Sequence, residues 1–141
     1  MIAYLDSSVL LRVLLNQPGK LKEFRTIEKA VASVLLKTEC LRVLDRLRIT
    51  GVLSEKNYLT AVNDLYEACA SVETVKITTS LLNRAGASMP VALGTLDAIH
   101  LSSALIWTET TEKSLSFLTH DKQLGKAAAA LGFRVFGVGI S

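Results

Sequence analysis

The sequence predicts an α/β fold, a three-layer α/β/α sandwich with a central, mainly parallel sheet. Strand candidates alternate with helix candidates along the chain, which is typical of a parallel sheet with helices on both faces. With 141 residues, 50% of them apolar, the chain is long enough to bury a core of its own. It shows no internal repeat and no linker, so we expect a single domain over residues 1–141.

The first elements are two buried strands separated by a helix. The apolar run Ile2–Leu5 predicts a strand, and the two serines that follow it supply N-terminal capping chemistry for a helix at Val9–Leu15. Asn16–Gly19, which contains a proline and a glycine, ends that helix. A charged amphipathic stretch, Lys20–Lys29, then leads to a second buried strand at Ala30–Val34.

Two amphipathic helices come next. The first stops at Gly51, and Ser54 with Asn57 starts the second. Their apolar stripes are Leu36, Cys40, Val43 and Leu47 in the first and Tyr58, Val62, Leu65 and Cys69 in the second. Because both cysteines fall within these stripes, we interpret them as reduced core thiols.

The second half of the chain repeats the alternation. The β-branched run Val72–Ile77 predicts a strand. Gly132 ends the last helix, and Thr95 caps the helix before it. In order, we expect a strand at Val72–Ile77, a helix at Ser80–Ala87, an irregular segment at Ser88–Gly94, a helix from Thr95 through Leu105 toward Trp107, a strand at Ser114–Leu118, a helix at Asp121–Leu131 ended by Gly132, and a strand at Phe133–Val138.

Charge is distributed unevenly along the chain. The net charge is only +3, but residues 12–56 contain ten basic and five acidic side chains, a local charge of +5. This bias has two interpretations, a solvated face or a face that binds a polyanion. No run of about 18 uncharged apolar residues occurs, and Asp6 interrupts the N-terminal apolar stretch. We therefore expect no membrane span, no signal peptide and a cytoplasmic location.

Four carboxylates stand where the predicted fold gathers its strand ends and helix starts. Asp6 ends the first strand, Asp121 follows the Ser114–Leu118 strand, and Asp97 and Glu39 lie in first turns of helices. In a parallel sheet these positions share one edge, where ligands bind. Taken singly, the helix macrodipole explains Glu39, Asp97 and Asp121, since an acid in a first turn is stabilising by about 0.3–1 kcal/mol.

Taken together, the four acids favour a cation site. Two carboxylates about 4 Å apart repel by roughly 4 kcal/mol at an effective dielectric constant of 20, so a converging group needs a positive charge at its centre. Carboxylate ligands with retained waters suit Mg²⁺ or Mn²⁺, whereas zinc prefers histidine or cysteine. His100 and His120 have no partner set for zinc, and we interpret His100 as a packing histidine.

These acids lie in four short segments with distinctive sequences. The segments are Tyr4, Leu5, Asp6, Ser7 and Ser8; Thr38 and Glu39 in an arginine-rich helix; Leu96, Asp97, Ala98, Ile99, His100 and Leu101; and Thr119, His120, Asp121, Lys122, Gln123 and Leu124 before an alanine-rich helix. In this order they resemble the four motifs of PIN domains, and most closely those of the VapC toxins of bacterial and archaeal toxin–antitoxin pairs. The resemblance covers essentially the whole chain.

The resemblance implies a fold, an activity and a site. PIN domains are α/β/α sandwiches, and VapC proteins are endoribonucleases that depend on Mg²⁺ or Mn²⁺. It makes Asp6, Glu39, Asp97 and Asp121 the catalytic acidic cluster. Asp6 and Asp97 would be direct metal ligands, Asp121 would complete the site, and Glu39 would orient the nucleophile. Ser8 and Thr119 would be supporting groups. It also implies an RNA substrate, an antitoxin partner and a homodimer.

Two arginines and several alternative functions remain open at this stage. Arg42 and Arg46 lie within about 60° and 20° of Glu39 around the helix. They either contact RNA phosphates, or they solvate the helix or pair with Asp45 and Glu39. The alternatives to a toxin are a PIN-fold RNA-processing nuclease without an antitoxin and a non-catalytic RNA- or protein-binding module. A phosphotransfer receiver domain would need an acidic pair after the first strand, where Asp6 is followed by two serines.

Overall fold

A computed structural model describes residues 1–139, and in that range the strands form one five-stranded sheet. The strands are β1 (Ile2–Leu5), β2 (Lys29–Ser33), β3 (Val72–Val75), β4 (Ser116–Leu118) and β5 (Arg134–Phe136). Their order is β3-β2-β1-β4-β5, and every neighbouring pair is parallel. The predicted parallel α/β sheet is therefore confirmed.

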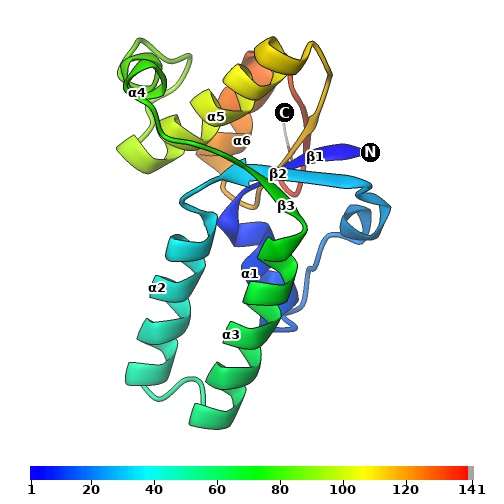
Figure 1. Ribbon diagram of the computed structural model, residues 1–141, viewed down its shortest axis with the longest axis vertical. Coiled ribbons are helices and arrows are strands. Elements are labelled where there is room, and N and C mark those ends of the chain that lie inside the picture. The colour runs from blue at the N-terminus through cyan, green and yellow to red at the C-terminus, as the bar shows by residue number, and fades with distance from the viewer. Residues whose placement is uncertain (140–141) are drawn as a thin grey trace.

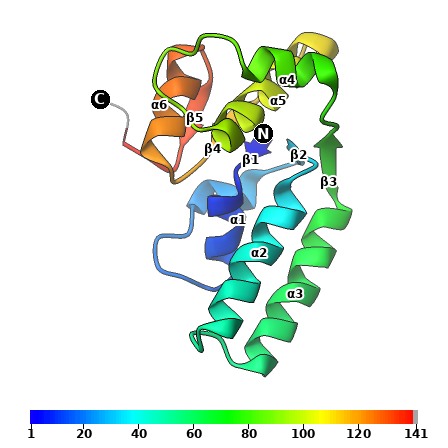
Figure 2. The ribbon, with the colours of Figure 1, turned by 90° about the vertical axis from the view of Figure 1, so that its left-hand side faces the viewer.

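Helices cover both faces of the sheet (Figures 1 and 2). One face carries α1 (Ser7–Leu14), α2 (Leu36–Ile49) and α3 (Glu55–Ala70), and the other carries α4 (Thr79–Ala85), α5 (Thr95–Thr111) and α6 (Lys122–Ala130). A short 3₁₀ helix, η1 (Lys22–Thr26), precedes β2. The helices α2 and α3 form an antiparallel hairpin that extends well past the sheet (Figure 2). This arrangement confirms the predicted three-layer sandwich.

The alternation of side chains along β1 separates two hydrophobic cores. Ala3 and Leu5 belong to the core under α1, α2 and α3, while Tyr4 belongs to the core under α5 and α6. All three side chains are at most 2% exposed. Because Asp6 comes directly after Leu5, it continues the pattern of Tyr4 and lies at the end of a strand whose last three residues are buried.

The strand order creates a topological switch point beside β1, and we call this part of the carboxyl edge of the sheet the crevice. The chain continues from β1 to β2 on one side, whereas it continues from β4 to β5 on the other. Since β1 and β4 are neighbours, their connections diverge at the carboxyl edge of the sheet. Such a switch point is where open parallel sheets bind ligands. The fold therefore places the ends of β1 and β4, with Asp6 and Asp121 just beyond them, at the natural binding edge.

Two local predictions were wrong in detail. Gly94, not Thr95, is the N-cap residue of α5, and no side chain caps that end. In α2 the fully buried residues are Leu36, Cys40 and Leu44, instead of the stripe that continued through Val43 and Leu47. Leu44 is buried because α2 packs against both α1 and α3. By contrast, the predicted cap of α3 is present: Ser54 Oγ accepts a hydrogen bond from the Asn57 amide.

Both cysteines are free thiols. Burial raises the pKa of the Cys40 thiol to about 12, so this side chain is an inert part of the core.

Within residues 1–139, no helix has the length and apolar character needed to cross a membrane.

Candidate functional site

Asp6 is the most buried of the four acids and is held by two hydroxyl groups. Its Oδ2 atom accepts hydrogen bonds from Ser8 Oγ at 2.6 Å and from Thr119 Oγ1 at 2.8 Å. Asp6 stands at the N-cap position of α1 but makes no capping hydrogen bond, and its residue is 6% exposed. A role as a helix cap therefore does not explain this carboxylate. The hydroxyl groups fix its orientation and leave Oδ1 without a hydrogen-bond partner among residues 1–139.

The loop after β4 is tied to the loop after β1. The Thr119 hydroxyl, which donates to Asp6, accepts the Asp121 amide at 3.0 Å, and the His120 amide donates to Ser8 Oγ at 3.0 Å. Asp121 is the N-cap of α6, where its Oδ1 accepts the Leu124 amide at 2.9 Å. Asp121 thus has a structural role, and the Thr119 hydroxyl connects its backbone to the Asp6 side chain.

Gly137, which follows β5, lets its backbone approach the backbone of Thr119 in this loop. Its φ angle is +110°, and a Cβ atom built on it would lie 2.1 Å from the carbonyl oxygen of Thr119. Only glycine allows this approach of the two backbones. The requirement was not foreseen from the sequence, where Gly137 is one of eight glycines with no local signal to distinguish it.

Asp97 shares its electrostatic environment with Asp6 and Asp121. It lies in the first turn of α5 and is half-buried. Burial raises the pKa of the Asp97 carboxyl, and the charges of Asp121 and Asp6 raise it further. The structure therefore brings these three acids, from α5 and from the loops after β1 and β4, to one crevice. In the protein without a cation their charges oppose one another.

Glu39 reaches the same crevice from α2 and contacts a buried histidine. Its Oε1 atom lies 2.5 Å from His100 Nε2, and His100 Nδ1 lies 2.8 Å from the Tyr4 hydroxyl. The Tyr4 oxygen also accepts the Ser33 amide at 3.1 Å. Burial lowers the pKa of His100, but the hydrogen bond and charge of Glu39 outweigh it, and the net shift is upward. His100 packs in the core as we predicted, yet its contact with a site carboxylate was missed.

The acids of the crevice offer the donor type that a hard divalent cation takes. Asp6, Asp97 and Asp121 offer carboxylate oxygens, the ligand type that Mg²⁺ and Mn²⁺ take. Their repulsion, which raises the pKa of Asp97, is the interaction that a cation would reverse. In the described part of the chain, no three acidic, histidine or cysteine side chains stand close enough to form a ready-made metal-binding group. A cation at this edge would therefore reach some of these carboxylates only through bound water.

Arg42 and Arg46 are exposed on α2, which runs away from the sheet (Figure 1). Arg42 pairs with Asp45, with 3.3 Å between Nη2 and Oδ2, as the solvation alternative predicted. Arg46 forms no ion pair with any residue in 1–139. Their contact with RNA stays a prediction.

A second basic group lies between α1 and η1. Lys20, Lys22 and Arg25 line a hollow of about 360 Å³ there, and none of them forms an ion pair within the described residues. Leu21, between the two lysines, packs against Gly137, which in turn abuts Thr119. We call these three basic side chains the basic loop. The charge bias of residues 12–56 pointed to this region without locating it.

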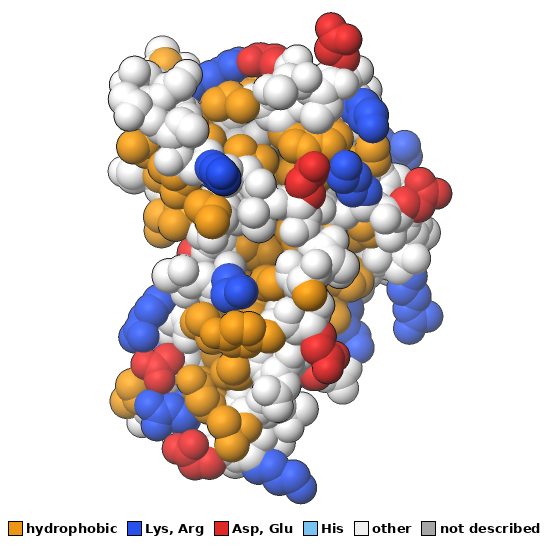
Figure 3. Space-filling model, viewed as in Figure 1, with side chains coloured by type: hydrophobic (Ala, Val, Ile, Leu, Met, Phe, Trp, Pro, Cys, Tyr) orange, Lys and Arg blue, Asp and Glu red, His pale blue; other side chains and the backbone are white. Residues whose placement is uncertain are grey.

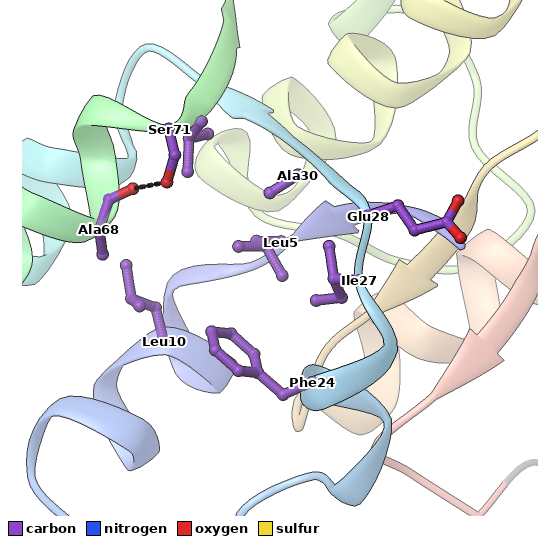
Figure 4. Close-up of a pocket in the computed structure, with 9 residues that line it drawn as sticks. Leu5, Leu10, Phe24, Ile27, Glu28, Ala30, Ala68 and Ser71 are labelled. Atoms are coloured by element: carbon purple, nitrogen blue, oxygen red, sulfur yellow. Dashed lines mark hydrogen bonds between the residues drawn. The ribbon is translucent and has the colours of Figure 1, made fainter.

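The pocket shown in Figure 4 is separate from the carboxylate crevice. It has a volume of about 270 Å³ and lies between α1, η1 and the junction of α3 with β3. Apolar side chains such as Leu10, Phe24 and Ile27 line it, and the carboxylate of Glu28 at its rim points away from the cavity. None of Asp6, Glu39, Asp97 or Asp121 lines it. This pocket suits an apolar group and offers no acid–base chemistry.

Comparison with known proteins agrees with the fold. The family model of the PIN domain matches residues 3–130, a range that includes all four carboxylates. The chain is also 28% identical over 138 residues to a protein named Ribonuclease VapC47 from Mycobacterium tuberculosis (strain CDC 1551 / Oshkosh). That match covers 92% of each chain.

Proposed function

The chain belongs to the PIN domain family, and on this premise we propose that it is a Mg²⁺- or Mn²⁺-dependent endoribonuclease. The observation that carries the proposal is the gathering of Asp6, Asp97 and Asp121 at the switch point of the sheet, where burial and mutual repulsion raise the pKa of Asp97. The similarity to a protein named as a ribonuclease supports RNA as the substrate.

The roles of the site residues follow from their surroundings. Asp6 and Asp97 would hold the cation directly, and Asp121 would complete its ligands with the oxygen that α6 does not use. A bound Mg²⁺ or Mn²⁺ ion would supply charge neutralisation at the phosphodiester and a lowered pKa for the attacking water. Ser8 and Thr119 orient Asp6. Glu39, whose side chain is 21% exposed, would orient that water and accept its proton.

Binding of RNA requires positive charge outside the acidic crevice. The basic loop offers three side chains free of ion pairs in the described structure, next to the loop that carries Thr119. Arg42 and Arg46 on α2 offer a second track, although Arg42 must leave Asp45 to use it. We propose that phosphates of a single strand follow these basic side chains across the crevice.

Removal of the Lys20 and Lys22 charges is expected to weaken RNA binding in a salt-dependent way. Each phosphate that the protein no longer neutralises should reduce the slope of log K against log salt by about 0.7 for single-stranded RNA. The measurement is fluorescence anisotropy of a labelled RNA with Lys20→Gln/Lys22→Gln, made in an Asp97→Asn background to prevent cleavage. Arg42→Gln/Arg46→Gln tests the α2 track in the same assay.

The matched control for the lysine pair is Lys56→Gln, because Lys56 is exposed at the far end of the α2–α3 hairpin. This variant should keep the wild-type slope. If Lys20→Gln/Lys22→Gln has the same slope of log K against log salt as the wild type, RNA does not interact with the basic loop.

We propose further that the enzyme is the toxin of a type II toxin–antitoxin pair and acts in the cytoplasm. The VapC-like motifs support this, and so does one surface suited to a protein partner. Large apolar side chains are exposed along the α2–α3 hairpin, among them Ile49, Val52, Leu59 and Tyr66, each at least 52% exposed. Figure 3 shows hydrophobic surface over this hairpin. We assign it to a homodimer contact and the carboxylate crevice to an antitoxin.

Expression and cleavage together test the function. Induced wild-type protein should arrest growth, and the purified protein should cleave RNA with Mg²⁺ or Mn²⁺ but not with EDTA. A housekeeping processing nuclease would cleave without arresting growth, and a binding module would do neither. Cleavage that persists unchanged in EDTA would contradict the metal dependence.

A further inference from the structure

Two buried side chains beside the crevice have no part in the chemistry proposed above. His100 is fully buried on α5, and Tyr4 is fully buried on β1, where its ring stacks on Phe117 with centroids 4.9 Å apart. Each uses its polar atoms in hydrogen bonds, so together they form a chain from the Ser33 amide to the Glu39 carboxylate. This chain connects β2, β1, α5 and α2.

The direction of the hydrogen bonds follows from the donors available. The Tyr4 oxygen accepts the Ser33 N–H, and its own proton is free to be donated to His100 Nδ1. A neutral His100 then carries its proton on Nε2, which donates to Glu39 Oε1. A protonated ring also has a proton on Nε2. Glu39 therefore receives this hydrogen bond in both charge states of the histidine.

The contact joins the two helical layers at the carboxyl edge of the sheet. Glu39 comes from α2 on one face, and His100 comes from α5 on the other. The histidine side chain is 1% exposed and that of Glu39 is 21% exposed, so Oε1 is anchored on a rigid buried group. Within residues 1–139, Oε2 has no hydrogen-bond partner and remains available at the crevice.

We propose that His100 and Tyr4 are positioning residues that hold Glu39 by one oxygen and keep the other directed to the reacting water. The inference rests on the proposed function, because it assigns these residues a purpose only if Glu39 acts on that water. Without the anchor, a glutamate side chain on an open helix start samples several rotamers, and misplacement of a reacting group by about 1 Å costs roughly a hundredfold in rate.

Activity in two backgrounds tests the positioning. His100→Ala should lower kcat by about 10- to 100-fold with KM unchanged, and His100→Gln, whose amide can donate to Glu39, should recover part of the loss. In a Glu39→Ala background, His100→Ala should cause no further loss. Tyr4→Phe, which keeps the ring against Phe117, should lower kcat less than His100→Ala. Ser102→Ala is the control, since Ser102 is equally buried on α5 and its hydroxyl has no partner in residues 1–139.

A measurement on the metal-free protein tests the contact without activity. The chain has only two histidines, so NMR should resolve a slowly exchanging, downfield proton on Nε2 of His100 in the wild type. Glu39→Ala and His100→Ala should both abolish that signal, and Ser102→Ala should keep it.

The outcomes separate the two claims. If the wild type cleaves no RNA with any divalent cation, the proposed function fails, and this inference fails with it. If the wild type cleaves but folded His100→Ala keeps its kcat, or loses as much in the Glu39→Ala background as in the wild type, the inference alone is overturned. Absence of the Nε2 signal in the wild type overturns it as well.

Discussion

Asp97→Asn and Asp6→Asn are each expected to reduce RNA cleavage by at least about a thousandfold. Each change removes a carboxylate charge from the crevice, and loss of about 4 kcal/mol of electrostatic stabilisation in the transition state corresponds to that factor. Cleavage of a labelled RNA under single-turnover conditions measures the effect. Asp64→Asn is the control, because Asp64 is exposed on α3. Variants of Asp6 and Asp97 that cleave at the wild-type rate would refute the site.

The stability of Asp97→Asn should move in the opposite direction to its activity. Folding raises the pKa of Asp97 above its ordinary value of 3.8. A carboxyl group whose pKa is raised by folding stabilises the folded state at pH values below its ordinary pKa. This stabilisation is lost as the pH rises through the pKa of the group in the folded state. In EDTA at pH 7 the asparagine variant should therefore melt at a higher temperature than the wild type, and the difference should shrink toward pH 4.

Gly137→Ala is expected to destabilise the protein by about 3 kcal/mol and to lower cleavage by about a hundredfold. The new methyl group would lie 2.1 Å from the Thr119 carbonyl at a φ angle of +110°. To relieve this overlap, Thr119 must move, and its hydroxyl then no longer holds Asp6. The loss of stability corresponds to roughly 10 °C in melting temperature, which calorimetry can measure, and kcat is measured below that transition.

Gly139→Ala provides the matched control two residues away. A Cβ atom at Gly139 meets nothing within 4 Å, so that variant should keep the wild-type stability and activity. Equal melting temperatures for the two alanine variants would contradict the close approach at Gly137.

Most of the fold was predictable because each element has a local signal in the sequence. The apolar run of β1 matches its prediction residue for residue, and Ser54 caps α3 as its position indicated. The gathering of Asp6, Asp97 and Asp121 at one edge was predictable as well, since parallel strands share their carboxyl ends. The errors, which are the cap of α5 and the buried stripe of α2, fall where tertiary contacts override the local signal of single residues.

The contacts that complete the site depend on tertiary geometry. Glu39 and His100 are 61 residues apart, and no spacing rule joins a first turn on one face of the sheet to a buried helix position on the other. His100 was predicted to be a packing residue of the core, and it is buried there. Gly137 is required by a backbone approach to Thr119, which only the folded chain creates.

Calorimetric titration of Mn²⁺ into the metal-free protein is the most direct test that Asp6 and Asp97 form a cation site, because it measures that site without RNA. The wild type and Asp64→Asn should bind Mn²⁺ with equal affinity, and Asp6→Asn and Asp97→Asn should each bind at least tenfold more weakly. Equal Mn²⁺ binding by the wild type and a protein that carries both Asp6→Asn and Asp97→Asn would contradict the account.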